Sequence, residues 1–245
     1  MAQTIMVVVQ ARMASVRLPG KALYPLAGTT VLGFLLNRLE ACEGVDRVVV
    51  ATTTRDEDAP IRRWAEAEAD VCVMCPEVDD VLGRFVLAAE ALGDDDVVVR
   101  LTGDNPLVCP EVVDHCAAWV ANGTYDYYRT GDTFPEGLDV EACTVALLRA
   151  AADIARLPFE REHLAAVLER LAERPGRYEL PQDWGHLRVT LDEPEDVPVV
   201  QGVAERLVGE APSLRALLAL ARWGPELFAG NAHVVRNAWK QEASS

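Results

Sequence analysis

The run Thr4-Ile5-Met6-Val7-Val8-Val9, followed by Gln10-Ala11-Arg12-Met13-Ala14-Ser15-Val16-Arg17-Leu18-Pro19-Gly20-Lys21, decides how this chain folds. The first part is short, apolar and rich in β-branched residues, which predicts a strand covered on both faces. The second part carries three cations and a Pro-Gly pair, which predicts a loop. The loop after a parallel strand lies at the carboxyl edge of an open α/β sheet, where ligands bind. We therefore expect residues 10–21 to form part of a ligand site.

Similar Val-rich runs recur through the first half of the chain and alternate with helical patterns. The strands are expected at residues 4–9, 47–51, 70–74 and 96–101. The helices are expected at residues 30–41, 58–68 and 78–92, with another from Pro110 to about residue 122. This alternation is typical of βαβ units, so the sequence predicts an α/β fold with a mainly parallel sheet.

The pattern loosens after Tyr125, and this half of the chain looks inserted or appended. We expect strands at residues 125–129, 138–143 and 186–191, helices at 145–156, 161–173 and 195–207, and a break at 175–181. Without a long linker or an internal repeat, residues 1–222 are predicted to form one domain. Residues 223–245 are predicted to be a tail, and the sequence does not indicate its role.

Charge and hydropathy exclude several classes of partner. The 245 residues include 23 basic and 39 acidic side chains, for a net charge of −16, so the surface should repel a nucleic acid backbone. The apolar run near the N-terminus is far shorter than the roughly 20 residues that a membrane span needs. We expect a cytoplasmic protein without nucleic acid or membrane partners.

The six cysteines lie in apolar runs and are expected to be reduced core residues. Cys72 and Cys75 have the spacing of half a zinc site, but no second pair with matching spacing follows. A structural zinc site needs four ligands, so we expect no metal there.

The basic loop is unusual because only two residues of this acidic chain are lysines, Lys21 and Lys240. Arg12, Arg17 and Lys21 would repel one another unless an anion lay among them, and a polyphosphate would supply that anion. The alternative is a solvated basic loop with surface ion pairs. The loop matches neither the P-loop nor the dinucleotide-binding fingerprint.

Two strands are expected to end in aspartates. Asp104 follows Gly103, which permits close backbone approach, and Asp192 precedes Pro194 and the predicted helix. Two carboxylates from separate strand ends could share Mg²⁺, which takes its other ligands from water and phosphate. The alternative for each aspartate is a turn or helix cap. Glu195 and Asp196 are expected to serve the helix dipole instead.

Five blocks in collinear order over residues 3–208 resemble the cytidylyltransferase family related to CMP-Kdo synthetases, in particular its spore-coat polysaccharide biosynthesis branch. The blocks are residues 10–21, residues 96–114 with Arg-Leu-Thr-Gly-Asp at 100–104, residues 134–141, Arg161-Glu162-His163, and residues 192–196. The resemblance implies a Rossmann-like nucleotidyltransferase fold with a small inserted subregion for dimerisation and acceptor binding. It also implies CTP and Mg²⁺, a CMP-activated product, pyrophosphate and a homodimer.

The resemblance also assigns roles to residues of this sequence. The triphosphate would lie on Arg12, Ser15, Arg17 and Lys21, and the base beside the backbone of Gln10 and Ala11. Arg100 and Thr102 would contact the nucleoside. The catalytic residues would be Arg12, Lys21, Asp104 and Asp192, of which Asp104 and Asp192 would bind the metal. The acceptor would lie near Glu136, Gly137, Asp139, Glu141, Arg161, Glu162 and His163.

The sequence also departs from the family pattern. Ala14 stands where many relatives have glycine, Gly83 where relatives commonly carry an acidic residue, and residues 164–166 replace a more polar run. The acceptor pocket is therefore expected to differ from that of a sugar-acid enzyme. His163 has a second interpretation as a packed helix-face residue.

The acceptor is expected to be small and anionic or polar, a sugar acid, an amino sugar or a phosphonate, because Arg129 and Arg161 lie in the variable half. Two other functions remain open. A nucleotide-sugar glycosyltransferase would not need three cations around a triphosphate tail, and release of pyrophosphate would distinguish it. A non-catalytic nucleotide-binding protein would bind CTP without producing pyrophosphate.

Overall fold

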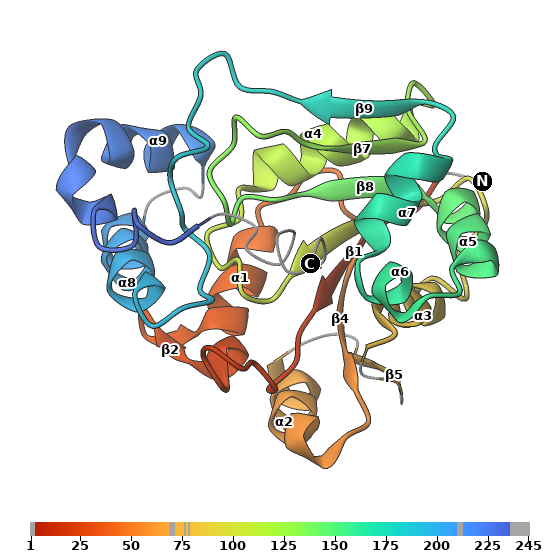
Figure 1. Ribbon diagram of the computed structural model, residues 1–245, viewed down its shortest axis with the longest axis horizontal. Coiled ribbons are helices and arrows are strands. Elements are labelled where there is room, and N and C mark those ends of the chain that lie inside the picture. Colours follow the sequence, from red (N-terminus) through yellow and green to blue (C-terminus); the bar gives the residue numbers. More distant parts are fainter. Residues whose placement is uncertain (1–2, 69–71, 76, 78, 210–212, 236–245) are drawn as a thin grey trace.

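The computed structural model describes residues 3–68, 72–75, 77, 79–209 and 213–235, and its centre is a seven-stranded sheet (Figure 1). The strand order is β5-β4-β1-β6-β8-β7-β9. The strands are β1 (Ile5–Gln10), β4 (Arg47–Thr53), β5 (Cys72–Cys75), β6 (Val97–Thr102), β7 (Tyr127–Thr130), β8 (Glu141–Thr144) and β9 (Pro175–Tyr178). Only β8 in this sheet runs antiparallel to its neighbours. The predicted α/β fold with a mainly parallel sheet is confirmed.

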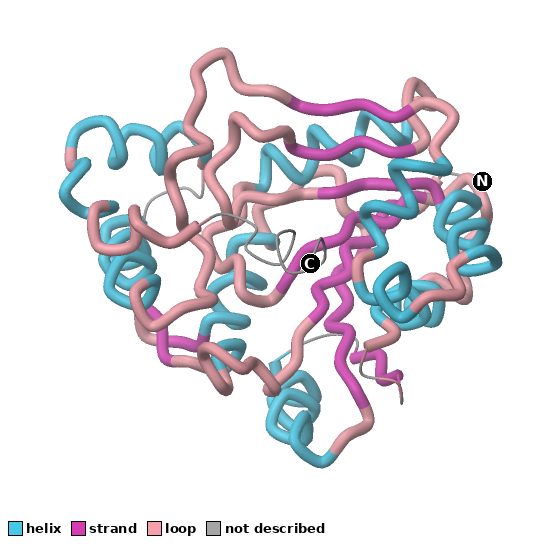
Figure 2. Tube along the Cα trace, in the orientation of Figure 1, coloured by secondary structure: helices cyan, strands magenta, loops and turns pink. Residues whose placement is uncertain are grey.

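Helices cover both faces of the sheet, as Figure 2 shows. One core lies under α1 (Val31–Leu39), α2 (Ala59–Glu68), α4 (Pro110–Ala121), α8 (Asp196–Leu207) and α9 (Leu214–Trp223). The other lies under α3 (Val81–Ala88), α5 (Val145–Ile154) and α7 (Leu164–Leu171), with the short α6 (Pro158–Glu162) beside them. Along β1, Val7 and Val9 enter the first core and Met6 and Val8 the second. An unbroken apolar run therefore suits this strand, because its side chains alternate between two buried faces.

Local side-chain bonds explain where several helices begin. The hydroxyl of Thr30 accepts a hydrogen bond from the N–H of Gly33 at 3.1 Å at the start of α1. Asp80 caps α3 in the same way, accepting from Gly83 N at 2.8 Å, and Ser213 caps α9. Because Asp80 ends the preceding loop, α3 begins later than the predicted helix, which starts at residue 78. Residue 78 lies outside the described residues, and so do residues 70 and 71 of the strand predicted at 70–74.

Short elements complete the chain. They are a two-stranded ribbon of β2 (Pro25–Leu26) and β3 (Thr29–Thr30), and three 3₁₀ segments, η1 (Lys21–Leu23), η2 (Asp56–Asp58) and η3 (Pro225–Phe228). Among the described residues, no helix combines the length and the apolar character needed to cross a membrane.

The predicted break at residues 175–181 is wrong, because Pro175–Tyr178 forms β9 and pairs with β7 in parallel. A proline is tolerated at the first position of an edge strand, where no ladder bond needs its missing N–H. The proline and glycine in this segment therefore mark an edge strand.

The predicted strand at residues 186–191 is also wrong. This segment makes only an isolated bridge, Glu136 to Arg188, although its backbone is also bonded to Asp104. The chain on the other side of this bridge turns directly after Glu136, at Gly137, where φ is 101°. A Cβ added to Gly137 would lie 2.4 Å from the backbone nitrogen of Thr190. The strand pairing cannot continue past this turn. The alternating apolar side chains of residues 187–191 are therefore buried, but their backbone forms no strand.

The helix predicted over residues 161–173 is two helices, α6 and α7, and α9 was not predicted. The backbone of His163 leaves the helical region, with φ −105° and ψ 59°. The first helix has no buried residues, whereas Leu164, Val167 and Leu168 of the second enter the core. Because the chain changes direction at His163, α7 packs into the core while α6 does not.

Candidate active site

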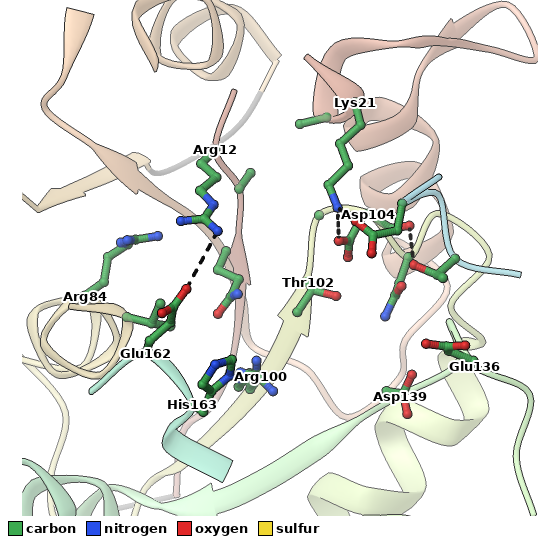
Figure 3. A pocket seen from close by; sticks show the side chains of 18 of the residues that line it. Arg12, Lys21, Arg84, Arg100, Thr102, Asp104, Glu136, Asp139, Glu162 and His163 are labelled. Atoms are coloured by element: carbon green, nitrogen blue, oxygen red, sulfur yellow. Dashed lines mark hydrogen bonds and ion pairs between the residues drawn. The ribbon is translucent and has the colours of Figure 1, made fainter. Parts of the chain in front are cut away.

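A cavity of about 540 Å³ opens at the carboxyl ends of β1 and β6 (Figure 3). The loops after these two strands meet there, and Gly103 explains how closely they approach. A Cβ on Gly103 would lie 3.0 Å from both the Cβ of Ala11 and the carbonyl oxygen of Gln10. The cavity is therefore at the edge of the sheet where the sequence predicts a ligand site.

Most of the predicted site residues come together around this cavity. Its lining includes Gln10, Ala11, Arg12, Arg17, Lys21, Arg100, Thr102, Asp104, Glu136, Asp139, Glu162, His163 and Asp192. Gln10, Arg100 and Thr102 share the sheet face of Val8 and Val98, which carries the helices α3 and α5. Strand alternation therefore directs these three side chains to one side of the cavity.

At one end of the cavity, the ammonium group of Lys21 lies between two carboxylates. Its Nζ is 2.5 Å from Asp104 Oδ2 and 2.6 Å from Asp192 Oδ1. The backbone joins the two aspartate segments as well, because Leu191 N donates to the carbonyl of Asp104 at 2.8 Å. The two carboxylates thus converge on one point, which the ammonium group of Lys21 occupies.

This cluster is strongly coupled electrostatically. Burial opposes the charge of Asp104, but the charge of Lys21 and the hydrogen bonds from Lys21 and Thr102 outweigh it and lower the pKa of that carboxyl. Burial likewise opposes the charge of Lys21, but Asp104 and Asp192 outweigh it and raise the pKa of the ammonium. Lys21 is therefore positively charged and Asp104 negatively charged at neutral pH.

Arg17 approaches the same cluster from the loop after β1. Its guanidinium forms ion pairs with Asp192 and with Glu193, the latter at 2.9 Å, and 46% of its side chain is exposed. Asp58 anchors the loop, because its carboxylate accepts the N–H of Met13 at 2.6 Å and a bond from the hydroxyl of Thr53. The loop is thus fixed to the start of α2, with the cations of its second half turned toward the aspartates.

The other end of the cavity carries a second group of cations. Arg12 lies 3.8 Å from both Asp79 and Glu162, and Arg84 of α3 lies close by (Figure 3). Arg84 is only 2% exposed, and burial, aided by the charge of Arg12, lowers its pKa. Arranging two guanidinium groups here favours an anionic or electron-rich ligand between them.

Two polar atoms of residues that line the cavity make no hydrogen bond within the described part of the chain. They are Gln10 Oε1 and Arg100 Nε, and both are buried. Arg100 Nη1 is bonded to Glu141 Oε1 at 2.7 Å, its cross-strand partner in register. Unmade hydrogen bonds of buried groups cost free energy, so these atoms are suited to bind a ligand or water.

His163 lies at the junction of α6 and α7 and lines the cavity, so the interpretation as a packed helix-face residue is wrong. Burial lowers its pKa; Glu162 opposes this shift, and the charges of Arg100 and Arg12 reinforce it. The imidazole is therefore neutral at pH 7.

Four predicted residues are not part of the cavity lining. Ser15 bonds to Leu18 N within the loop, and Gly137 forms the tight turn beside Thr190. Glu141 holds Arg100 and the hydroxyl of Tyr127, and Arg161 pairs with Asp80 at 2.6 Å. Glu141 and Arg161 thus lie behind the cavity, where Glu141 holds Arg100 and Arg161 holds Asp80.

Three polar lining residues were not selected from the sequence, namely Arg84, Asn105 and Thr190. Arg84 follows the already noted Gly83, but a single arginine in an apolar helix gives no signal of its own. Asn105 directly follows Asp104, and its position beside that strand end could have indicated it. Thr190 is two residues before Asp192, within the segment that was predicted to be a strand.

Comparisons with known proteins identify relatives of this chain. The model of the cytidylyltransferase family matches residues 6–173. Spore coat polysaccharide biosynthesis protein SpsF of Bacillus subtilis is 30% identical over 242 residues, covering 91% of this chain and 95% of that protein.

Solved structures share the fold. A cytidylyltransferase from Leptospira borgpetersenii has a TM-score of 0.84 at 31% identity, over 92% of this chain and 97% of that one. CMP:2-keto-3-deoxy-manno-octonic acid synthetase complexed with CTP has a TM-score of 0.63 at 16% identity, over 83% of this chain and 99% of that one, a likeness of fold. Given the match over residues 6–173 and the near full-length similarity to SpsF, the chain belongs to the cytidylyltransferase family related to CMP-Kdo synthetases.

Proposed function

We propose that this protein transfers CMP from CTP to a small acceptor, a sugar acid, an amino sugar or a phosphonate, and releases pyrophosphate. The observation that carries the proposal is the Lys21 ammonium between Asp104 and Asp192, at 2.5 and 2.6 Å, in a cavity that Arg12 and Arg17 also line. A solvated basic loop does not need two converging carboxylates. A triphosphate with a metal ion needs both signs of charge in one place.

In this proposal the triphosphate lies along the loop after β1. Arg12 and Arg17 are partly exposed, 41% and 46%, and their ion pairs leave donors for phosphate oxygens. Lys21 stabilises the pyrophosphate as negative charge develops on it. Gln10, Ala11, Arg100 and Thr102 would contact the nucleoside, and Ser15 would support the turn of the loop.

Asp104 and Asp192 would hold Mg²⁺. The donor set fits this ion, because it consists of two hard carboxylates that converge on one point. Mg²⁺ commonly takes one or two protein carboxylates and completes its shell with water and phosphate oxygens. When bound, it would neutralise phosphate charge and orient the α-phosphate. Lys21, released from the carboxylates, would then be available to the phosphates.

The reaction would be an in-line displacement. A new bond forms between an acceptor oxygen and the α-phosphorus, the bond from that phosphorus to the bridging oxygen breaks, and pyrophosphate leaves with the electron pair. The residues of the chain position both substrates and stabilise charge, and no covalent enzyme intermediate is needed.

The acceptor would lie among Glu136, Asp139, Glu162 and His163, which line the cavity. Glu162 also borders the basic loop, because it lies 3.8 Å from Arg12. Gly137, Glu141 and Arg161 would act from behind the cavity, by shaping the turn and by holding Arg100 and Asp80. A neutral His163 and carboxylates suit hydrogen bonds to sugar hydroxyl groups or to an amine.

The test has two stages. A thermal-shift screen with Mg²⁺ and each nucleoside triphosphate should give the largest stabilisation with CTP, because only binding to the folded state raises the melting temperature. A pyrophosphate assay with CTP and candidate acceptors should then give signal that depends on the acceptor. Tight CTP binding without pyrophosphate from any acceptor would contradict the proposal.

We also propose that the protein is a cytoplasmic homodimer. The α5–α6 connection exposes Ile154, Leu157 and Phe159, at 44, 62 and 42%, and such neighbouring apolar side chains favour a protein partner. Five cysteines of the described residues are free thiols, as a reducing compartment would keep them. Light scattering should give twice the mass of the chain, and Leu157→Glu should shift it to a monomer.

A further inference from the structure

Behind Asp192, the C-terminal segment inserts one polar side chain into the interior. Asn231 lies three residues after η3 and is 1% exposed. Its Nδ2 donates two hydrogen bonds, to Asp196 Oδ1 at 2.8 Å and to the carbonyl oxygen of Arg188 at 3.1 Å. The segment beyond α9 is therefore bonded to residues next to the cavity.

Asp196 connects this amide to the backbone of Asp192. Its Oδ2 accepts the N–H groups of Asp192 at 2.9 Å and of Glu193 at 2.8 Å. The same carboxylate receives two bonds from Arg188, Nε to Oδ1 at 2.8 Å and Nη2 to Oδ2 at 2.9 Å. The orientation of the Asp196 carboxylate therefore determines where the turn carrying Asp192 lies.

This arrangement is buried and has no freedom to exchange partners with bulk water. Asp196 is 0% exposed and Arg188 6%, so each hydrogen bond is made in a medium of low polarity. Arg188 also lies 2.7 Å from Glu136 Oε2, and Glu136 lines the cavity. One guanidinium thus joins the acceptor side of the cavity to the support of Asp192.

We propose that Asn231 is a positioning residue for Asp192, acting through Asp196, so that the segment after α9 takes part in the function of the site. The inference rests on the proposed function, in which Asp192 binds the metal ion. Groups that orient metal ligands typically contribute about 10- to 100-fold to metal affinity or activity.

The rest of the Asn231 side chain supports a role for its donor. Its Oδ1 is buried and has no hydrogen-bond partner among the residues that the structure describes. An unmade hydrogen bond of a buried acceptor costs free energy, so an apolar side chain would fill the space better. Both N–H bonds of the amide, in contrast, are made to the support of Asp192.

The experiment compares Asn231→Ala and Asn231→Asp with Phe228→Leu as the matched control. Asn231→Asp keeps the size but replaces the donor by an acceptor that faces Asp196. Phe228, 4% exposed in the same segment, is an apolar side chain that cannot donate a hydrogen bond to the Asp196 carboxylate. Two quantities are measured in the full chain: amide hydrogen exchange at Asp192 and Glu193, and binding of Mn²⁺ with CTP followed by electron paramagnetic resonance.

The proposal expects faster exchange at both amides and about tenfold weaker Mn²⁺ binding in both Asn231 variants. Phe228→Leu should lower the melting temperature and leave both quantities unchanged. Unchanged exchange or unchanged Mn²⁺ affinity in Asn231→Ala, or equal changes in Phe228→Leu, would overturn the inference while leaving the proposed function standing. If the wild-type protein binds no Mn²⁺ with CTP, the proposed function fails first, and the inference fails with it.

Discussion

At the scale of single residues, the site depends on opposite charges that neutralise each other until a substrate arrives. Lys21 bridges Asp104 and Asp192, and Arg17 pairs with Asp192 and Glu193. These ion pairs offset the repulsion between the cations, and between the carboxylates, when no ligand lies in the cavity. In the proposed function, phosphate oxygens would take the place of the carboxylates beside Lys21 and Arg17, and a metal ion would take the place of these cations beside Asp104 and Asp192.

Asp104→Asn should abolish most of the turnover and leave the fold intact. The asparagine keeps the size of the side chain, and Lys21 keeps Asp192, but one of the two carboxylates that we propose to bind the metal ion is lost. We expect release of pyrophosphate from CTP and acceptor to fall by at least about a hundredfold. The control is Asp153→Asn, an exposed carboxylate on α5. Near-normal turnover in Asp104→Asn would show that the metal assignment is wrong.

Arg84→Met should weaken the binding of CTP. Arg84 is 2% exposed, and burial together with the nearby charge of Arg12 lowers its pKa, whereas the carboxylates of Asp58 and Asp80 oppose this shift. We expect about tenfold weaker CTP binding by calorimetry, typical for a charge-assisted hydrogen bond. The melting temperature should also fall, because removing one member of a buried charged group leaves its partners uncompensated.

The matched control for that variant is Arg63→Met, since Arg63 is exposed on α2. It should bind CTP like the wild type. Equal CTP affinity in Arg84→Met and Arg63→Met would remove Arg84 from the nucleotide site.

The sequence predicts the charged residues of the site better than those that support them. Lys21 and Asp104 stand out because they follow strands and because lysine is rare in this chain. Asn231 gives no such signal, because its partners Arg188 and Asp196 are 43 and 35 residues away along the chain. Only the packing of η3 against α8 brings them together.

At the scale of elements, the parallel strands were predictable because a strand covered on both faces has an unbroken apolar sequence. The same reasoning fails at residues 186–191, whose apolar alternation is satisfied by burial beside Glu136 and Asp104 without a ladder. It fails again at β9, because edge strands tolerate the proline and glycine that elsewhere mark a break. An apolar sequence pattern indicates that a segment is buried. Whether the buried segment is a strand depends on its backbone hydrogen-bond partners, which lie far along the chain.

The loop after β1 depends on its anchor in η2. In Asp58→Ala the N–H of Met13 and the hydroxyl of Thr53 lose their buried acceptor, which should cost about 1–3 kcal/mol of stability. The loop contains three trypsin sites, at Arg12, Arg17 and Lys21, so we expect faster tryptic cleavage there and weaker CTP binding. Glu57→Ala, at a half-exposed neighbour, serves as control. Cleavage at the wild-type rate in Asp58→Ala would mean that the loop is fixed by its other contacts.

At the scale of the whole molecule, the net charge of −16 is an average over an uneven distribution. The cavity gathers Arg12, Arg17, Lys21, Arg84 and Arg100, five cations on four separate elements and loops. An acidic exterior should repel polyanions, whereas the cavity is suited to a small anion. The composition alone therefore predicts that nucleic acid is not a partner, and the fold brings the five cations to one place.

The stability of the folded chain should fall in acid because of two carboxylates. Burial opposes the charge of Asp196, but Arg188, the N–H groups of Glu193 and Asp192, and Asn231 outweigh it and lower its pKa; Lys21 does the same for Asp104. An unfolded aspartate titrates near pH 3.9, so between the folded and unfolded pKa values the unfolded chain binds more protons. The stabilisation from both groups is thus fully present above about pH 4 and is lost progressively as the pH falls from there toward the lower pKa values of the folded chain.

Urea unfolding at pH 6, 5, 4 and 3.5 should test this directly, with the midpoint decreasing toward acid. Asp196→Asn should be less stable than the wild type at pH 6, and the difference should shrink as the pH falls, because the unfolded wild-type chain then gains a proton at this carboxyl and becomes more stable relative to the folded chain. Asp153→Asn should follow the wild type at every pH. A constant difference between Asp196→Asn and the wild type would mean that the asparagine disrupts packing and that the charge of Asp196 contributes nothing to stability.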